Sequence, residues 1–170
     1  QSLDPDERRA LEQARNAWRD VRAAAITTLE SCGVRTNTTL NAQQSWKWLE
    51  NKQAGRLSAF WIRPAPPRNM SHGGRSQILR ALILRIYWDG SEQPSVLVPL
   101  GDFFCNGLRA SEFASLPMAS MDGTFVCRFP MPFRKGIRAE LQNTCHVPIP
   151  IEAGFSIEPP DGTKDPNYFH

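Results

Sequence analysis

The chain has 170 residues, enough for one domain with a real core, and its 14 prolines and 11 glycines imply many short elements joined by turns. This composition favours β-structure. The formal net charge of +3 is compatible with nucleic-acid binding, but the 20 basic residues are spread along the chain among 17 acidic ones. We therefore expect no nucleic-acid partner.

The apolar stretches, the first residue and the cysteines are the features of the sequence that bear on the cellular compartment of the protein. No stretch approaches the roughly 20 apolar residues of a membrane span, and no signal-peptide core is present. The chain begins with Gln1 instead of methionine, which suggests removal of a leader or of a longer N-terminal part and slightly favours export over a cytoplasmic location. Four cysteines without C-x-x-C spacing leave two alternatives open, disulfides in an exported protein or buried free thiols: Cys32, Cys105, Cys127 and Cys145.

Residues 4 to 33 are predicted to form one long helix. Asp4 suits the N-cap, Pro5 the first helical position and Glu7 a capping box, while Gly33 supplies the stop. A narrow apolar stripe follows a spacing of three and four residues, as in Leu11, Ala14, Trp18, Val21, Ala25, Thr28 and Cys32. So narrow a stripe needs a partner, either the helix's own domain or another subunit, which Leu11, Trp18 and Val21 would contact.

A second helix is predicted over residues 42 to 53, and the hydrophobic period then changes from helical to two. Residues 57 to 63 read as a strand, and the proline-rich stretch from 63 to 75 reads as a loop with a tight turn at Gly73-Gly74. His72 in that loop is expected to be solvated and not a catalytic base. We accordingly divide the chain into a helical extension over residues 1 to 54 and a β-domain over 55 to 170.

Alternating apolar residues predict five further strands, at 82 to 88, 96 to 100, 125 to 133, 137 to 142 and 147 to 157. Prolines in the opposite phase of the last strand suit an edge or bulged strand. Six short antiparallel strands, with a wide loop from 105 to 123, favour a mainly β fold, a jelly-roll sandwich preceded by the long N-terminal helix. The chain has no glycine-rich phosphate loop, no nucleophile elbow and no zinc-ligand spacing, so we expect no metal and no cofactor.

One stretch resembles a known family. "LRIYWDGSEQPSVLVPLGDFF", residues 84 to 104, is similar to the signature of glycoside hydrolase family 172, close to L-R-x-Y-W-D-G-E-x-x-P-S-V-x-V-P-L-G-D-F-F-G. Further similarity follows at Pro117-Met118, in the M-P-F of 131 to 133, at 141 to 143 and at 168 to 170. The resemblance covers about residues 55 to 170, whereas the first 54 residues depart from the family's serine- and asparagine-rich opening.

The resemblance implies a fold and a reaction class. Members of this family are double jelly rolls that assemble as trimers or hexamers and act on α-fructofuranosyl and arabinofuranosyl linkages with retention. Retention needs two carboxyl groups about 5 to 5.5 Å apart, one as nucleophile and one as acid and base. The family's glutamates stand in W-G-E-G-D and G-T-G-x-E-D-Y-F stretches of the second jelly roll, and neither stretch occurs in this sequence. We therefore expect no catalytic residue in this chain and an incomplete jelly roll without a second half or a partner chain.

The signature itself has two interpretations. Asp89-Gly90 is expected to turn the chain after its strand, and the second acidic position starts the wide loop. The structural interpretation places the neighbouring aromatic residues at the end of the core. The functional one makes a sugar-facing or subunit-facing rim of four residues, Trp88, Asp102, Phe103 and Phe104.

Two functions follow for the chain. It is either the N-terminal jelly roll of a furanoside hydrolase, truncated or completed by another polypeptide and inactive alone, or a non-catalytic subunit for assembly or carbohydrate binding. Jelly rolls serve both roles, so the fold does not decide between them. The expected partners are a second copy, a second jelly-roll chain or carbohydrate.

Overall fold

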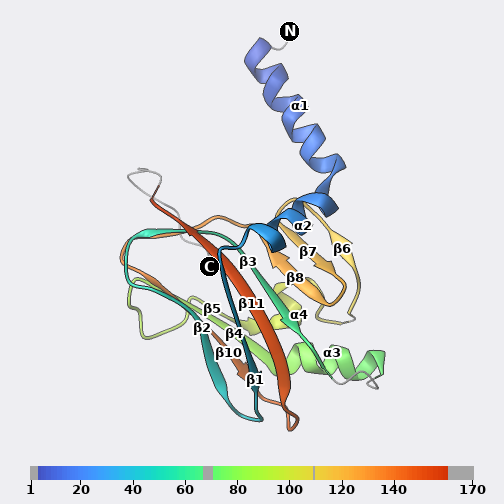
Figure 1. Ribbon diagram of the computed structural model, residues 1–170, viewed down its shortest axis with the longest axis vertical. Helices are drawn as coiled ribbons and strands as arrows, with labels where there is room; N and C mark the ends of the chain where they lie inside the picture. Colours follow the sequence, from blue (N-terminus) through green and yellow to red (C-terminus); the bar gives the residue numbers. More distant parts are fainter. Residues whose placement is uncertain (1–3, 67–70, 109, 161–170) are drawn as a thin grey trace.

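The computed structural model of the chain describes residues 4–66, 71–108 and 110–160. The described strands form two antiparallel sheets with a common core between them, one of seven strands and one of four (Figure 1). The predicted class, a mainly β jelly-roll sandwich of antiparallel strands behind an N-terminal helical segment, is confirmed.

The strand order places elements that are distant in sequence side by side. The larger sheet runs in the order β1 (Val34–Leu40), β11 (Ile149–Glu158), β3 (Gly55–Pro64), β8 (Thr124–Cys127), β7 (Met118–Met121) and β6 (Phe113–Ala114), while β9 (Met131–Phe133) pairs with another part of β3. The smaller sheet runs in the order β2 (Ser45–Asn51), β10 (Ile137–Asn143), β4 (Leu82–Trp88) and β5 (Val96–Pro99). The free edges of the two sheets on one side are therefore β1 and β2.

Aromatic rings cross the core from one sheet to the other. The ring of Trp48 on β2 lies 5.4 Å from that of Phe60 on β3, between centroids. Phe60 in turn lies 5.9 Å from Phe104, which follows the short helix α4 (Leu100–Phe103), and Phe104 lies 5.3 Å from Phe125 on β8. Tilted and edge-on ring pairs at such distances stabilise a core beyond the area they bury.

The N-terminal helix is shorter than predicted because it breaks at Asp20. Helix α1 (Pro5–Arg19) has the predicted capping box between Asp4 and Glu7, and α2 (Val21–Ser31) follows it. Asp20 has φ −121° and ψ 37°, outside helical values, so the two segments take different directions. Helix α1 projects away from the sheets, and α2 lies on the outer face of the larger sheet (Figure 1).

Helix α2 covers a glycine and an indole on that face. Trp61 of β3 pairs with Gly154 of β11, and the indole packs with Ala25 of α2 in a small second core. A Cβ on Gly154 would lie 2.4 Å from Trp61 Nε1, so only glycine fits beneath the ring. Buried in the same cluster, the Cys32 thiol has a raised pKa because of its burial, with Ser156, Arg35 and Trp61 acting in the opposite direction.

The predicted helix over residues 42 to 53 is wrong, because most of this segment forms β2. A bulge between Ala139 and Glu140 of β10 shifts its register against β2, and both Trp48 and Leu49 are buried. Two consecutive buried residues break the alternation of a strand and imitate a helical pattern. The helical part of the predicted extension therefore ends at Ser31.

Two other local predictions need correction. The stretch from 72 onward is not a tight turn: helix α3 (His72–Ala81) begins there, with the Ser71 hydroxyl accepting from the Gly74 amide at 3.1 Å. Of the two alternatives for the last strand, the edge strand is wrong, since β11 pairs with β1 and β3 on its two sides, whereas the bulged strand agrees with a register shift between Ser156 and Ile157. Pro150, which has no backbone N–H to donate, is compatible with this strand because it pairs with Thr39 of β1 one residue before the pairing with β3 begins.

The described part of the chain contains eleven strands instead of six, because β1, β2, β6 and β7 were not predicted and 125 to 133 is split in two. The two strands of the signature are confirmed as antiparallel neighbours. Leu84, Ile86 and Val96 are buried as expected, and Val98 is half-buried against the same core.

Asn143 fastens the two sheets together at one end. Its fully buried amide donates to the carbonyl oxygen of Leu40 on β1 at 3.0 Å and to that of Val147 at 2.8 Å. Its Oδ1 accepts from the backbone N–H of Cys145 at 3.0 Å. A polar side chain is therefore stable in this position because three backbone groups satisfy it.

Candidate functional site

Of the four signature residues proposed for a rim, Trp88 lies apart from the other three. Trp88 and Phe104 are buried, Phe103 is half-buried, and Asp102 is exposed. Pro99 pairs with Ile83, so α4 starts at the opposite end of β4 from Trp88, about 17 Å away at roughly 3.4 Å per residue. The Phe103 and Phe104 rings lie 5.0 Å apart and both contact Phe60. These positions match the structural interpretation of the signature.

The Asp89-Gly90 pair forms the expected turn and also holds a distant loop. Both residues have positive φ, 55° and 82°, and the Ser91 amide donates to the Trp88 carbonyl at 2.9 Å. Asp89 Oδ1 accepts from the consecutive backbone amides of residues 134, 135 and 136 at 2.9, 2.6 and 3.2 Å. The carboxylate of the signature therefore anchors the segment that leads into β10.

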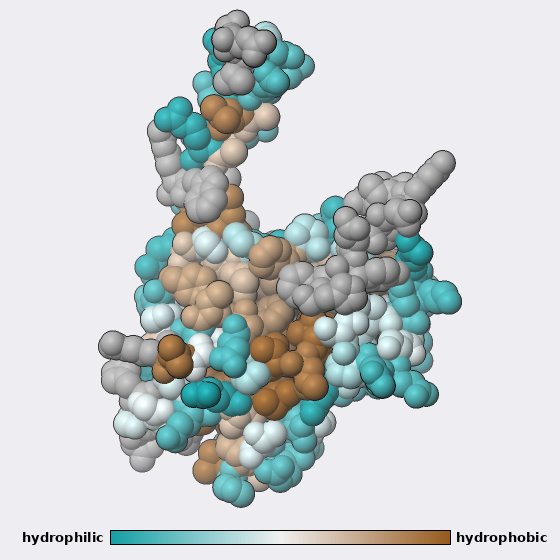
Figure 2. Space-filling model, turned by 180° about the vertical axis from the view of Figure 1, so that it is seen from behind, coloured by the Kyte–Doolittle hydropathy of each residue, from teal (hydrophilic) through white to brown (hydrophobic). Residues whose placement is uncertain are grey.

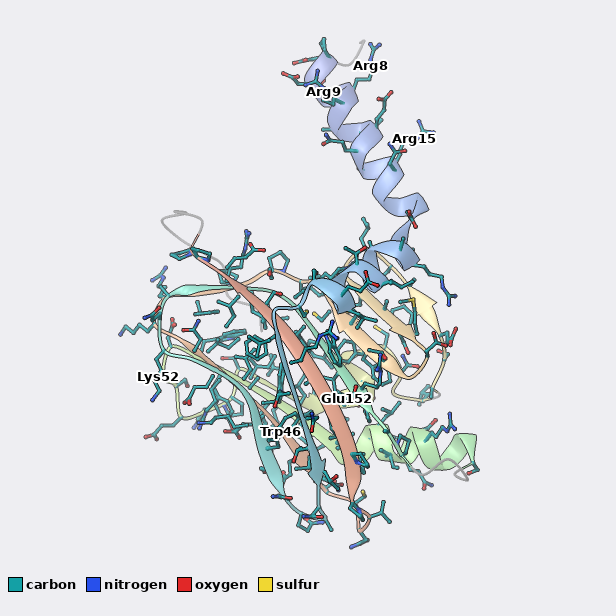
Figure 3. The ribbon with its side chains drawn as sticks, viewed as in Figure 1. Arg8, Arg9, Arg15, Trp46, Lys52 and Glu152 are labelled. Atoms are coloured by element: carbon teal, nitrogen blue, oxygen red, sulfur yellow. The ribbon has the colours of Figure 1, made fainter. Side chains whose placement is uncertain are left out.

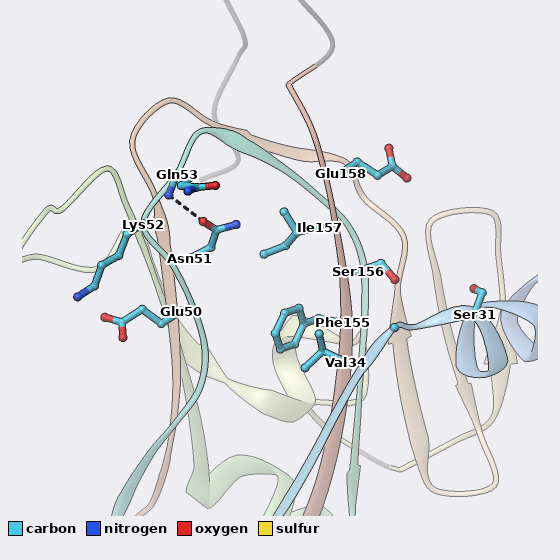
Figure 4. Close-up of a pocket in the computed structure, with 11 residues that line it drawn as sticks. Ser31, Val34, Glu50, Asn51, Lys52, Gln53, Phe155, Ser156, Ile157 and Glu158 are labelled. Carbon is cyan, nitrogen blue, oxygen red and sulfur yellow. Dashed lines mark hydrogen bonds between the residues drawn. The ribbon is translucent and has the colours of Figure 1, made fainter.

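A cleft opens where the free edges of the two sheets diverge. It has a volume of about 840 Å³ and is lined by the start of β1, the end of β2 with the following turn, and the end of β11. Figure 4 shows Asn51, Phe155 and Ile157 turned toward one another across it. Gln53 lies beside Asn51, and its backbone N–H donates to Asn51 Oδ1 at 2.7 Å. We name this groove the edge cleft.

Two carboxylates lie on the borders of the edge cleft, and each has a basic partner. The Lys47 ammonium donates to Glu50 at 2.7 Å and lowers the pKa of Glu50, with smaller effects from Lys52 and Arg138. A hydrogen bond from Arg56 lowers the pKa of Glu158. Both carboxylates are therefore ionised at neutral pH, and they point away from each other (Figure 4).

The chemistry of the edge cleft suits recognition of a polyol. Phe155 is half-buried and offers part of an aromatic ring, while the amide of Asn51 and that of Gln53 offer donors and acceptors. Among the described residues no group of three His, Cys, Asp or Glu side chains could hold a metal ion. Neither bordering carboxylate has the raised pKa that a general acid needs at neutral pH.

Other acidic side chains also have structural partners. Glu152 pairs with Arg63 at 3.3 Å. The Asp102 carboxylate lies against Gly107, where a Cβ would be 1.9 Å from its Oδ1.

The sequence did not indicate the edge cleft, because its lining comes from three segments that are far apart in the chain. The nearest signal was the period of two in residues 147 to 157, which correctly predicted a strand but not that the inward side chains at its end would face an open groove.

The three residues proposed for subunit contact lie on or next to α1. Leu11 is 51% exposed and Val21 is half-buried, while the side chain of Trp18 lies outside the described residues, as does that of His72. Every described side chain from Asp4 to Asn16 is exposed. Figure 3 shows Arg8 and Arg15 on one side of the helix and Arg9 on the other, all far from the sheets. The predicted stripe is therefore divided: its α2 part, with Ala25 and Cys32, packs against the chain's own domain, whereas the described side chains of α1 do not.

Within the described residues, no helix has the length and apolar character needed to cross a bilayer. All four cysteines are free thiols in this structure.

Comparison with known proteins bears on the whole β-domain. A search of curated proteins gave no match. The family model described as GH172 domain-like matches residues 31–152, which hold every strand from β1 to β10 and the start of β11. Since this match covers most of the chain and both sheets, the chain belongs to the GH172 domain-like family and is a relative of the glycoside hydrolases of family 172.

Proposed function

We propose that this domain is the N-terminal jelly roll of a furanoside-acting glycoside hydrolase, that it binds saccharide in the edge cleft, and that it does not hydrolyse saccharide alone. The observation that carries the proposal is the cleft itself: a groove of about 840 Å³ with an aromatic floor and amide groups, bordered by carboxylates that are already paired with bases.

The carboxyl groups that a retaining mechanism requires support the proposal that the domain does not hydrolyse saccharide alone. A retaining mechanism needs one protonated and one ionised carboxyl group about 5 to 5.5 Å apart. Glu50 and Glu158 both have a lowered pKa and point in different directions, and Asp89 holds backbone amides. The catalytic pair is accordingly expected on another jelly roll, in the same polypeptide or in a partner chain.

An apolar surface on the back of the molecule supports contact with such a second jelly roll. Figure 2 shows apolar side chains gathered in the middle of this face. Strand β5 and helix α4 lie on this side of the molecule (Figure 1), and Leu97 of β5 is 60% exposed while Val98 and Phe103 are half-buried. Contiguous exposed apolar surface commonly marks a protein interface.

Hydrolysis and binding are tested separately. Purified residues 1 to 170 should show no turnover of nitrophenyl α-arabinofuranoside or α-fructofuranosyl disaccharides, but should bind arabinofuranosyl oligosaccharides in calorimetry. Turnover by the chain alone, lost in Glu50→Gln or Glu158→Gln, would place a catalytic pair in this domain and overturn the proposal. Gln53→Ala should weaken binding, whereas Arg80→Ala, exposed on α3 and outside the cleft, should not.

The projecting helix favours a second function, assembly. A helix of 15 residues is marginal in water by itself, and the capping box of α1 and the exposed pair between Arg9 and Asp6 add little to its stability. We propose that Leu11, Trp18 and Val21 contact a second copy of the chain. Deletion of residues 1 to 19 leaves α2 in place and should lower the mass measured by light scattering; an unchanged mass would remove this role.

A further inference from the structure

A second depression adjoins the edge cleft on the other side of β2. It has a volume of about 430 Å³ and is lined by the end of β2, the turn at Asp89-Gly90 and the segment that enters β10. We name it the turn pocket. Glu50, Asn51 and Lys52 line both depressions. Figure 4 shows Asn51 turned toward the edge cleft while Glu50 and Lys52 point to the opposite side of the strand, so the end of β2 is a ridge between the two.

The walls of the turn pocket are held in one arrangement. Three backbone amides bind Asp89 Oδ1, and the Asp89 amide donates to the Gly136 carbonyl at 2.8 Å. Gly136 lies so close to β2 that a Cβ would be 2.5 Å from the Asn51 carbonyl oxygen. The Arg138 guanidinium lies over the ring of Tyr87, 3.9 Å from its centre. Pre-ordered walls reduce the entropy that a ligand must overcome on binding.

The groups in the turn pocket are polar and of both kinds. Lys52 and Lys135 present donors and Glu92 presents an acceptor at the surface. The half-buried Arg138 pairs with Glu140 at 3.3 Å, and Glu50 pairs with Lys47 at 2.7 Å. Lys52, Lys135 and Glu92 form no ion pair with any side chain in the described part of the chain. Donors and acceptors around a lining that also includes Tyr87 and Ile137 suit a sugar, which has both hydroxyl groups and apolar C–H faces.

We infer that the edge cleft and the turn pocket are consecutive subsites for a single oligosaccharide that passes over the end of β2. The inference rests on the proposed saccharide binding by the edge cleft and adds the ligand class, a chain of several sugar units instead of a monosaccharide or disaccharide. A unit held against Phe155 and a unit beside Lys135 lie on opposite sides of the ridge at Lys52, and only a linked chain occupies both.

The test is the dependence of affinity on chain length. The full chain is titrated calorimetrically with linear arabinofuranosyl oligosaccharides of increasing length. We expect the dissociation constant to fall by about tenfold once the ligand is long enough for both subsites, a modest part of what linked sites can contribute. The double variant Glu92→Ala with Lys135→Ala should lose this gain and bind the shortest ligand as before. Gln53→Ala should weaken all lengths by a similar factor, and Arg80→Ala should change none.

The outcomes separate the two proposals. Affinity that does not depend on length, or a gain with length that survives the double variant, overturns the second subsite while leaving saccharide binding by the edge cleft intact. Absence of binding at every length overturns the proposed function itself.

Discussion

Replacement of Asn143 should lower the free energy of unfolding by more than the small size of this side chain suggests. It lies at the end of β10 in the smaller sheet, and its amide reaches the Leu40 carbonyl of the larger sheet. Asn143→Leu keeps the side-chain volume nearly constant and removes all polar atoms. The variant therefore leaves three backbone groups without their partner and creates no large cavity.

The magnitude follows from the surroundings of each group. The Leu40 carbonyl belongs to a residue that is 1% exposed, and an unpaired buried acceptor costs about 1 to 3 kcal/mol. The other two groups belong to Val147, which is exposed, and to the half-buried Cys145, where water replaces the lost bonds at about 0.5 to 1.5 kcal/mol each. The total is about 4 kcal/mol, a large share of the roughly 5 to 15 kcal/mol that keeps a domain folded.

Urea denaturation followed by tryptophan fluorescence measures this loss as a change in the free energy of unfolding. Thr144→Val is the matched control, because the next residue donates one exposed hydrogen bond to the Ala81 carbonyl at 2.8 Å and its loss should cost below about 1 kcal/mol. A loss below about 1 kcal/mol for Asn143→Leu, with an unchanged dependence on urea, would refute the idea that this side chain fastens the sheets.

Three further predictions concern packing, pH and thiol reactivity. Gly154→Ala should destabilise the domain by about 1 to 3 kcal/mol in thermal unfolding, because the new methyl group meets the indole lying on it; an unchanged midpoint would contradict this packing. In an NMR titration Glu158 should titrate below its ordinary value of 4.5, and Arg56→Gln should return it toward that value. The stability lost in Arg56→Gln should be present above pH 4.5 and vanish as the pH falls through the lowered pKa; a constant difference would argue against the pair. Burial raises the pKa of Cys127 to about 12, so a thiol reagent at pH 8 should modify exposed Cys105 and reach Cys127 only after unfolding; similar rates would contradict the buried position.

The strands of the signature could be predicted because one physical cause dominates them. In β4, Leu82, Leu84 and Ile86 are buried and alternate with the half-buried Ile83 and Arg85, and a period of two appears wherever one face of a strand meets a core. The start of α1 could be predicted for an equally local reason, since the side chains of Asp4 and Glu7 each accept from the other's backbone N–H without help from the rest of the chain.

Where a neighbouring strand imposed the pattern, sequence reasoning failed. The bulge that shifts β10 against β2 lies at 139 and 140, far from the consecutive buried pair Trp48 and Leu49 that it accompanies. The prolines of β11 left an edge strand and a bulged strand as alternatives, but Pro150 lies before the pairing with β3 begins, so they did not show that β11 has a partner on both sides. The residues that adjoin these two segments in the sequence do not indicate which strands the segments pair with.

In the candidate site, too, some features follow from the local sequence and others only from the tertiary structure. The sequence by itself determined that Asp89-Gly90 turns the chain, because positive φ at both positions favours such residues. Only the tertiary structure decided that the Asp89 carboxylate holds the amides of 134 to 136, and that Asn51 and Phe155 face each other across the edge cleft. The physical reason is that a turn depends on the dihedral preferences of adjacent residues, whereas a groove between sheets depends on which strand edges remain unpaired, and pairing joins segments about a hundred residues apart in this chain.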